Sequence, residues 1–242
     1  MALAIATAGA AEAQVACESL KGFVAPDVKV TAATSAATPV PLCKLDGVVG
    51  KEINFSIWLP DAWNGKFVMG GQGGFAGRVE SQAMGMNALQ RGYAIAGTDT
   101  GHTGPAGATD GIWAMGDLER VVNYAHAAIH RVTATSKSIL QSRYGRAPDK
   151  SYFAGCSNGG RHAMVAAARY PGDYDGILAG NPGFHLPKAA TAQLWKVQQY
   201  ASIASTGANG QPDIASAVTA AEYKLLGERI VVQARRVLEE SV

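Results

Sequence analysis

The 242-residue sequence lacks the features that mark several large classes of protein. After residue 13 no run of 18 apolar residues occurs, which predicts a soluble chain with no membrane-spanning helix. The net charge is only +2 and no block of Lys and Arg is present, so a nucleic-acid partner is not expected. No internal repeat is found. These absences leave an ordinary globular protein whose oligomeric state the composition does not decide.

Cysteine is also scarce, with three residues in the chain. Cys17 and Cys43 flank a Thr-, Ala- and Pro-rich segment, 26–41, that looks poorly ordered by itself, and a disulfide between them would hold it. Cys156 is then left over. Its partner would lie on another chain or be missing from this one. Disulfide bonding is typical of exported proteins.

Residues 1–13 fit the remnant of a secretory signal peptide. They are apolar and small, and Ala11-Glu12-Ala13 matches an A-x-A cleavage site, although the usual basic start is lacking. The alternative is a disordered Ala-rich start. Together with the cysteines, this segment predicts a secreted or periplasmic protein.

Short apolar strands alternate with helices along the rest of the chain. The predicted strands are 53–59, 66–69, 93–97, 151–154 and 176–179, and the predicted helices are 79–91, 117–142, 158–170, 188–204 and 216–238. This alternation is typical of an α/β fold with a mainly parallel sheet and helices on both faces. The Gly-rich loop 98–116 is long and polar, so it is a candidate site loop.

The strongest functional signal is the sequence Gly-Cys-Ser-Asn-Gly at 155–159, which lies between a predicted strand and a predicted helix. In α/β-hydrolases, G-x-S-x-G in this context forms a sharp turn that exposes the serine hydroxyl. Ser157 is therefore the candidate nucleophile, and the Asn158 N–H is a candidate oxyanion donor. A purely structural turn is the alternative. A phosphate cradle is a second one, but the lysine of a P-loop is absent.

A second oxyanion donor is expected from a loop after an early strand. The Gly-rich loop 70–77 fits, since glycines let backbone approach a substrate closely. Gly74 is the favoured donor and Gly73 its neighbour. The alternative is a tight loop without this role.

A catalytic acid and a base should follow the serine in the chain. Only His162 and His185 do. His162 follows too closely in the next helix, and His185 comes too soon after the next strand, so it more readily lines the site or caps a loop. Asp173 and Asp175 fit caps of a turn. We therefore expect the acid and the base to lie outside this chain.

Four side chains near the candidate loops have weaker signals. Asp99 and His102 fit a polar cluster at the site or ordinary loop-bracing hydrogen bonds. Trp113 and Phe75 could stack on an aromatic acyl group or pack in the core.

His126 and His130 stand four residues apart, which is a metal-ligand spacing on a helix. No third ligand pattern accompanies them, so a boundary or solvated helix face is favoured and no metal site is assigned.

Four segments carry a family resemblance together, and in chain order they are 58–67, 71–77, 98–102 and 155–161. With them the chain resembles the tannase and feruloyl esterase family. The resemblance runs from about Cys17 to about Ala234. It implies an exported α/β-hydrolase with a lid inserted after the nucleophile region, acting on small esters of hydroxylated aromatic acids. It implies no cofactor for catalysis and a structural calcium in the lid. Cys17–Cys43 resembles the family's N-terminal disulfide, and Cys156 matches a cysteine that bonds one beside the distant histidine.

The sequence departs from the family after 234. The acidic calcium loop expected there is absent from 235–242. We therefore expect a fragment of low or no activity whose sheet is incomplete at the C-terminus and leaves an unpaired edge. Its expected parts are a stapled segment 14–50, a catalytic portion 51–204 and the start of a lid, 205–242.

Two rival functions remain. One is a non-catalytic binding module that keeps the hydrolase fold without a triad. The other is a thiol hydrolase using Cys156, which is disfavoured because the turn should point the residue before the serine into the fold.

Overall fold

The structure is a computed structural model that describes residues 14–79, 87–104 and 110–239. The chain forms two compact units, which divide between Phe184 and His185. The sequence predicted a boundary between the catalytic part and the lid at 204/205, which is later in the chain than this division. The boundary between catalytic part and lid stays a prediction. The predicted signal segment, 1–13, lies outside the described residues. Among the described helices, none is long and apolar enough to cross a membrane.

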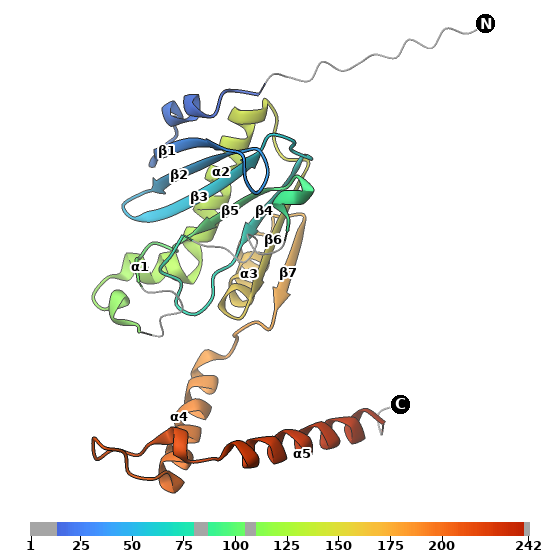
Figure 1. Cartoon of the computed structure of the whole chain (residues 1–242). Helices are drawn as coiled ribbons and strands as arrows, with labels where there is room; N and C mark the ends of the chain where they lie inside the picture. The colour runs from blue at the N-terminus through green and yellow to red at the C-terminus, as the bar shows by residue number, and fades with distance from the viewer. Residues whose placement is uncertain (1–13, 80–86, 105–109, 240–242) are drawn as a thin grey trace, which may run out of the picture. The chain divides into compact units, whose positions relative to one another are not determined.

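The first unit is built on one seven-stranded sheet with the order β1-β2-β3-β5-β4-β6-β7. Figure 1 shows these strands side by side with the long helix α2 crossing them. The strands are β1 (Val28–Ala36), β2 (Leu42–Val49), β3 (Ile53–Pro60), β4 (Lys66–Gly70), β5 (Ala94–Thr98), β6 (Lys150–Cys156) and β7 (Gly176–Gly180). The pairs β5–β4, β4–β6 and β6–β7 are parallel, and β1, β2 and β3 extend the sheet in antiparallel order.

All five predicted strands are present, but β1 and β2 were not predicted. The segment 26–41 was expected to be poorly ordered by itself, whereas residues 28–36 pair with β2 from Val28↔Val49 to Ala36↔Leu42. The reason is tertiary, because β2 supplies the ladder partners that the segment lacks alone.

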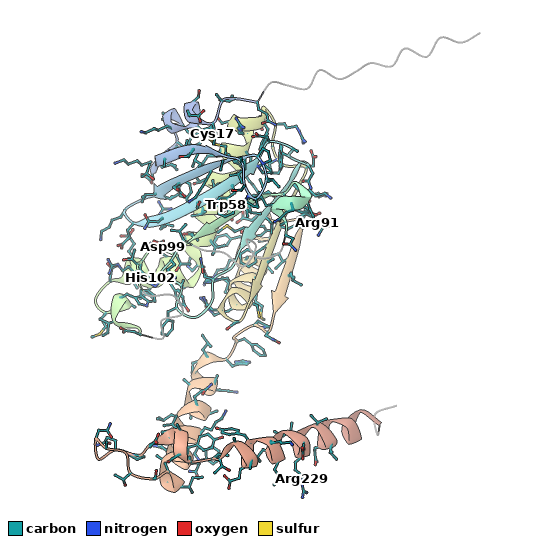
Figure 2. All side chains as sticks on the ribbon, viewed as in Figure 1. Cys17, Trp58, Arg91, Asp99, His102 and Arg229 are labelled. Carbon is teal, nitrogen blue, oxygen red and sulfur yellow. A yellow bond between two sulfur atoms is a disulfide. The ribbon has the colours of Figure 1, made fainter. Side chains whose placement is uncertain are left out.

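The predicted disulfide Cys17–Cys43 is present. Cys43 lies on β2 and is fully buried, and Cys17 directly precedes η1 (Glu18–Gly22). Figure 2 labels Cys17 at the end of the sheet where the chain enters. The bond holds η1 against β1 and β2, with Leu20 buried beneath it.

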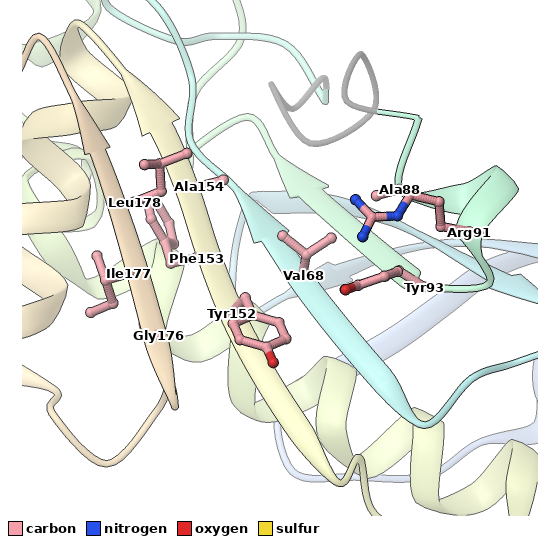
Figure 3. Close-up of a pocket in the computed structure, with 10 residues that line it drawn as sticks. All are labelled: Val68, Ala88, Arg91, Tyr93, Tyr152, Phe153, Ala154, Gly176, Ile177 and Leu178. Atoms are coloured by element: carbon pink, nitrogen blue, oxygen red, sulfur yellow. The ribbon is translucent and has the colours of Figure 1, made fainter.

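One face of the sheet is covered by a small apolar cluster. It comprises Leu42, Val68, Ala88, Leu89, Ile95 and Ala154. The predicted helix 79–91 falls here, and 80–86 lie outside the described residues; the described remainder includes η3 (Leu89–Arg91), closed by Gly92. Next to the cluster a cavity of about 360 Å³ lies over β4, β6 and β7, with Tyr93, Tyr152 and Leu178 in its lining (Figure 3).

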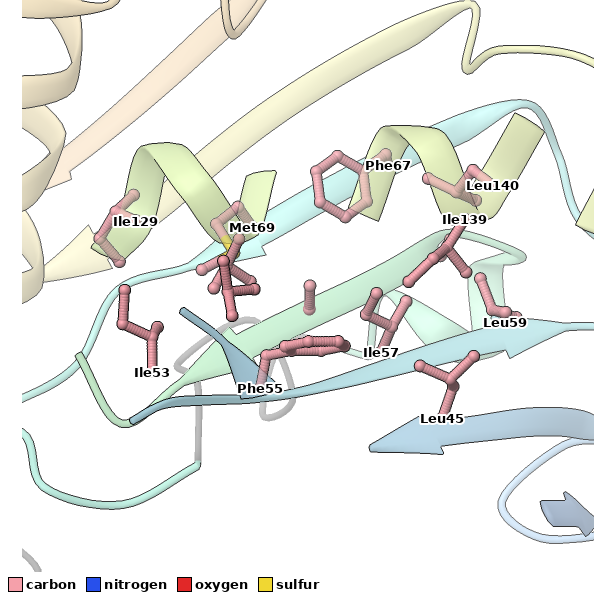
Figure 4. Close-up of a cluster of buried hydrophobic side chains, with 14 of the residues drawn as sticks. Leu45, Ile53, Phe55, Ile57, Leu59, Phe67, Met69, Ile129, Ile139 and Leu140 are labelled. Carbon is pink, nitrogen blue, oxygen red and sulfur yellow. The ribbon is translucent and has the colours of Figure 1, made fainter. Parts of the chain in front are cut away.

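The opposite face carries the main core and two helices, α2 (Ala128–Tyr144) and α3 (Asn158–Arg169). Figure 4 shows side chains of α2 meeting side chains of β2, β3 and β4 there. Phe55, Phe67 and Ile139 are among the fully buried ones, and each such side chain contributes about 1.5–3 kcal/mol by leaving water. This core fixes where β6 and α3 meet, which is the candidate site.

The helix predicted over 117–142 is present as a continuous run from 118 to 144. It begins as α1 (Leu118–Val122), where the Asp117 carboxylate accepts a hydrogen bond from the Arg120 N–H as the predicted cap. It then passes through a π-helical turn, η5 (Asn123–Ala127), before α2, which ends at Tyr144 and is capped by Gly145. The short helix η4 (Ile112–Ala114) precedes it.

The second unit is helical. It contains α4 (Leu186–Ile203), η6 (Ile214–Ser216) and α5 (Ala220–Glu239), close to the two helices predicted there.

Candidate active site

Ser157 lies at the turn between β6 and α3. Its backbone has φ 59° and ψ −119°, a strained conformation for a residue with a side chain, and it is exposed. The Ser157 N–H donates to the Gly180 carbonyl and the Ser157 carbonyl accepts from the Gly183 N–H, at 3.0 and 3.1 Å. The end of β7 and the segment that follows it therefore hold the strained residue in place.

Glycine at 155 is required by close approach of the backbone. A Cβ atom placed on Gly155 would overlap the carbonyl group of Gly159 in the first turn of α3. This crowding explains why the residues two before and two after Ser157 are both glycine in a turn this tight.

The first turn of α3 begins directly after Ser157. The backbone N–H groups of a helix's first turn have no partner within the helix and carry its positive dipole end. The Asn158 N–H is one of them. The Asn158 side chain is buried; its amide donates to the Gln72 carbonyl at 3.2 Å, and its Oδ1 accepts from the Arg161 Nε at 2.8 Å.

The loop after β4 brings Gly74 to the same region. Gly74 is exposed and has φ +54°, a conformation that glycine adopts without strain. The Gly73 carbonyl accepts from the Ala76 N–H at 3.0 Å, which orients the peptide group that carries the Gly74 N–H. On the other side, the Gly74 carbonyl lies 3.1 Å from the Tyr124 hydroxyl.

A serine on a strained strand-to-helix turn, with a glycine loop joined to the same helix, is typical of the nucleophile region of α/β-hydrolases. The sequence model of the family described as "Tannase and feruloyl esterase" matches residues 38–233. The chain belongs to the tannase and feruloyl esterase family.

Two curated relatives illustrate the likeness. The mono(2-hydroxyethyl) terephthalate hydrolase of Piscinibacter sakaiensis is 34% identical over 220 residues, which are 82% of this chain and 36% of that protein. A probable feruloyl esterase of Arthroderma benhamiae is 41% identical over 154 residues, which are 61% of this chain and 28% of that protein. The chain therefore spans about a third of the length of these relatives.

A solved member of the family confirms the fold. The crystal structure of feruloyl esterase B from Aspergillus oryzae matches with a TM-score of 0.66 and 26% identity, over 79% of this chain and 42% of that one. The expected α/β-hydrolase-like architecture is thus confirmed for the first unit of this tannase and feruloyl esterase family member.

His162 lies inside the protein, on α3. It is 2% exposed, and burial lowers its pKa to about 3. It is therefore neutral near pH 7 and shielded from a substrate, which supports its exclusion as the general base. His185 begins the second compact unit, and its expected place lining the site or capping a loop stays a prediction.

His126 and His130 contact residues after α3. The Nδ1 atom of His126 lies 2.6 Å from the Tyr170 hydroxyl, and that of His130 lies 2.7 Å from the Asp173 Oδ2. The His130 ring also stacks on Tyr170. These contacts support the interpretation as a boundary helix face, and three or more His, Cys, Asp or Glu side chains do not gather as metal ligands anywhere in the described ranges.

Asp99 and His102 both follow β5, and Figure 2 labels them near α1. Asp99 is buried and braces the loop, because its carboxylate accepts from the Asn54 N–H and side-chain amide and from the Gly101 N–H. Burial raises its pKa to about 6. Asp99 was expected either to join a polar cluster at the site or to brace the loop, and its hydrogen bonds fit loop bracing.

An aromatic cluster stands beside the glycine loop and comprises Phe75, His102, Trp113 and Tyr124. Trp113 stacks on His102 with ring centroids 3.7 Å apart, and Phe75 meets Trp113 and Tyr124 edge to face. One face of the Trp113 ring is thus already covered by His102. Phe75 and Trp113 therefore pack against neighbouring rings while staying partly exposed, and stacking of either ring on an aromatic acyl group stays a prediction.

Cys156 is exposed, contrary to the expectation that it points into the fold. It ends β6 opposite Gly180 of β7, the last strand in the sheet order. Its disulfide to a cysteine outside this chain stays a prediction.

The roles of two residues at the site were not predicted from the sequence, although Arg161 lies in the segment 155–161 that carries the family resemblance. Arg161 donates to Asn158 Oδ1 and to the backbone carbonyls of Ala125 and Tyr124. Tyr124 lies within the helical pattern predicted for 117–142, where an aromatic residue indicates only core. Both residues reach the site because η5 lies beside α3. This proximity arises from the tertiary fold, so the local sequence does not indicate it.

Proposed function

We propose that this chain carries the nucleophile of a carboxylic ester hydrolase that works through a serine acyl-enzyme. The observation that carries the proposal is the exposed Ser157 at φ 59° on the turn from β6 to α3, next to first-turn N–H groups that have no partner within the helix. The Ser157 oxygen attacks the ester carbonyl, and the carbonyl oxygen becomes negative. The amides of Asn158 and Gly74 donate to it. Removing one such donor typically costs a factor of about 100–1,000 in rate.

The substrate class follows from the relatives, whose names include feruloyl esterase and mono(2-hydroxyethyl) terephthalate hydrolase. Both names denote esters of aromatic acids. We therefore propose small esters of hydroxylated aromatic acids, and a protein that is exported, as the Cys17–Cys43 disulfide favours.

The general base is proposed to be a histidine outside the 242 residues. His126, His130 and His162 contact other groups, and His102 stacks on Trp113. The general base accepts the Ser157 proton and returns it to the leaving alcohol. We expect slow turnover by this chain alone, and an added base should quicken acylation.

The test is covalent labelling of Ser157 by a fluorophosphonate, with and without imidazole as the added base. We expect one label per chain at Ser157, faster with imidazole, and none at this position in Ser157→Ala. Ser138→Ala, which removes an exposed serine of α2, is the matched control and should be labelled like the unsubstituted chain. Absence of labelling in every condition would favour the non-catalytic binding module, and labelling that persists in Ser157→Ala at Cys156 would favour the thiol enzyme.

A further inference from the structure

The Tyr124 hydroxyl lies between the two segments that carry the proposed oxyanion donors. Its oxygen is 3.1 Å from the Gly74 carbonyl and 2.9 Å from Asn158 Oδ1. Both of these atoms are acceptors, so the single phenolic hydrogen is shared between the loop after β4 and the first residue of α3. These segments are far apart in the sequence, and Tyr124 belongs to a third one.

The Tyr124 ring is itself held on several sides. It lies in the π-helical turn η5, a rare distortion that is frequent at functional sites. Its ring meets Phe75, Trp113 and His162 edge to face, at centroid distances of 6.0, 5.2 and 5.8 Å. The guanidinium of Arg161 lies 4.8 Å from the ring centroid. A ring fixed in this way gives its hydroxyl one position.

Two hydrogen bonds flank Gly74 itself within the loop after β4. Gly74 is exposed, and among the described residues the Gly73 carbonyl is bonded to Ala76 N while the Gly74 carbonyl is bonded to Tyr124. These two bonds fix the peptide groups before and after Gly74. Without the bond from the Tyr124 hydroxyl to the Gly74 carbonyl, the Gly74 ψ angle would be free to change, because glycine has the least restricted backbone of all residues.

We propose that Tyr124 is a positioning residue of the oxyanion hole, whose hydroxyl holds the Gly74 loop and Asn158 at the spacing that the developing oxyanion requires. This inference rests on the proposed esterase function and adds a residue to it. Oxyanion donors act because they are oriented before the reaction, so a freed donor loses its effect without leaving the site. Burial raises the Tyr124 pKa, which keeps the hydroxyl protonated as a donor at neutral pH.

The experiment compares Tyr124→Phe with the unsubstituted chain in fluorophosphonate labelling of Ser157. The maximal labelling rate should fall by about 10-fold, less than for outright loss of a donor, with the half-saturating reagent concentration unchanged. The thermal unfolding midpoint should also stay close to that of the unsubstituted chain, because the ring and its contacts remain. Tyr170→Phe is the matched control, since it removes a phenol hydroxyl bonded to His126 instead, and it should label at the normal rate.

Each outcome decides one point. An unchanged maximal rate in Tyr124→Phe, or a loss confined to the fraction of chains that label, would overturn the positioning role and leave the esterase proposal standing. No labelling at Ser157 in the unsubstituted chain would overturn both. If Tyr124→Phe unfolds, Tyr124→Met keeps apolar bulk without a hydroxyl and takes its place, with the same expected loss of rate.

Discussion

The side-chain amide of Asn158 donates to the Gln72 carbonyl over 3.2 Å, and both residues are buried. This bond joins the first residue of α3 to the loop after β4. Gln72 is held in turn, because its own amide donates to the carbonyls of Arg78 and Thr98 at 2.9 and 3.0 Å. The two backbone segments with the proposed oxyanion donors are therefore joined by buried hydrogen bonds as well as by Tyr124.

Asn158→Ala tests this connection. The variant keeps the Asn158 backbone N–H but leaves the Gln72 carbonyl without its side-chain partner and removes an acceptor from Arg161. Because an unsatisfied buried polar group costs about 1–3 kcal/mol, the free energy of unfolding in urea should fall by that amount. Gln141→Ala is the control, since Gln141 is exposed and water can replace its bond to Gly145. If both variants lost the same free energy of unfolding, the hydrogen bond between Asn158 and Gln72 would not be what stabilises the site.

Gly155→Ala tests the crowding at the turn. Its added methyl group would overlap the Gly159 carbonyl, and neither backbone segment can move without displacing β6 from α3. Overpacking of this kind costs about 1–3 kcal/mol, so the thermal midpoint measured by circular dichroism should drop clearly. Gly172→Ala is a strict control, because a Cβ atom at Gly172 meets nothing within 4 Å and its φ angle is not positive. A similar drop in both would show that the close approach is not the cause.

The sequence predicted the turn at 157 because its signal is local. Glycines at fixed offsets from a serine, between a strand and a helix, describe a backbone geometry within one short segment. The strands β4, β5, β6 and β7 were likewise predicted, since each is a short apolar run bounded by turns.

What depends on distant partners was not predictable. β1 has weak strand character by itself and exists because β2 pairs with it along its whole length. The role of Tyr124 requires that η5 pass beside both Gly74 and Asn158, which no periodicity in the sequence can indicate. The exposure of Cys156 depends in the same way on what packs against β6 and β7.

The Cys17–Cys43 disulfide should contribute to stability through the unfolded chain. The bond closes a loop between residues 26 apart in the sequence. Closing a loop of this size lowers the conformational entropy of the unfolded chain and so stabilises the folded state by about 3 kcal/mol. The double variant Cys17→Ser/Cys43→Ser should therefore unfold at a correspondingly lower urea concentration. Dithiothreitol should destabilise the unsubstituted chain to the same level and leave the double variant unchanged. A large effect of the reductant on the double variant would contradict this account, because the bond would not be its target.

His162 should make the first unit sensitive to acid. In the unfolded chain its pKa is near 6.5, whereas burial lowers it to about 3 in the folded protein. Between these values the unfolded state binds more protons, so stability rises with pH across this window and is lost as the pH falls from 6.5 toward 3. At 1.36 kcal/mol for each pH unit, the effect reaches at most about 5 kcal/mol. His162→Gln cannot take up this proton, so its stability relative to the unsubstituted chain should increase steadily from pH 7 to pH 4. His185→Gln controls for losing a histidine from the second unit. Parallel curves of unfolding free energy against pH for His162→Gln and the unsubstituted chain would show that the buried ring is not the acid-sensitive group.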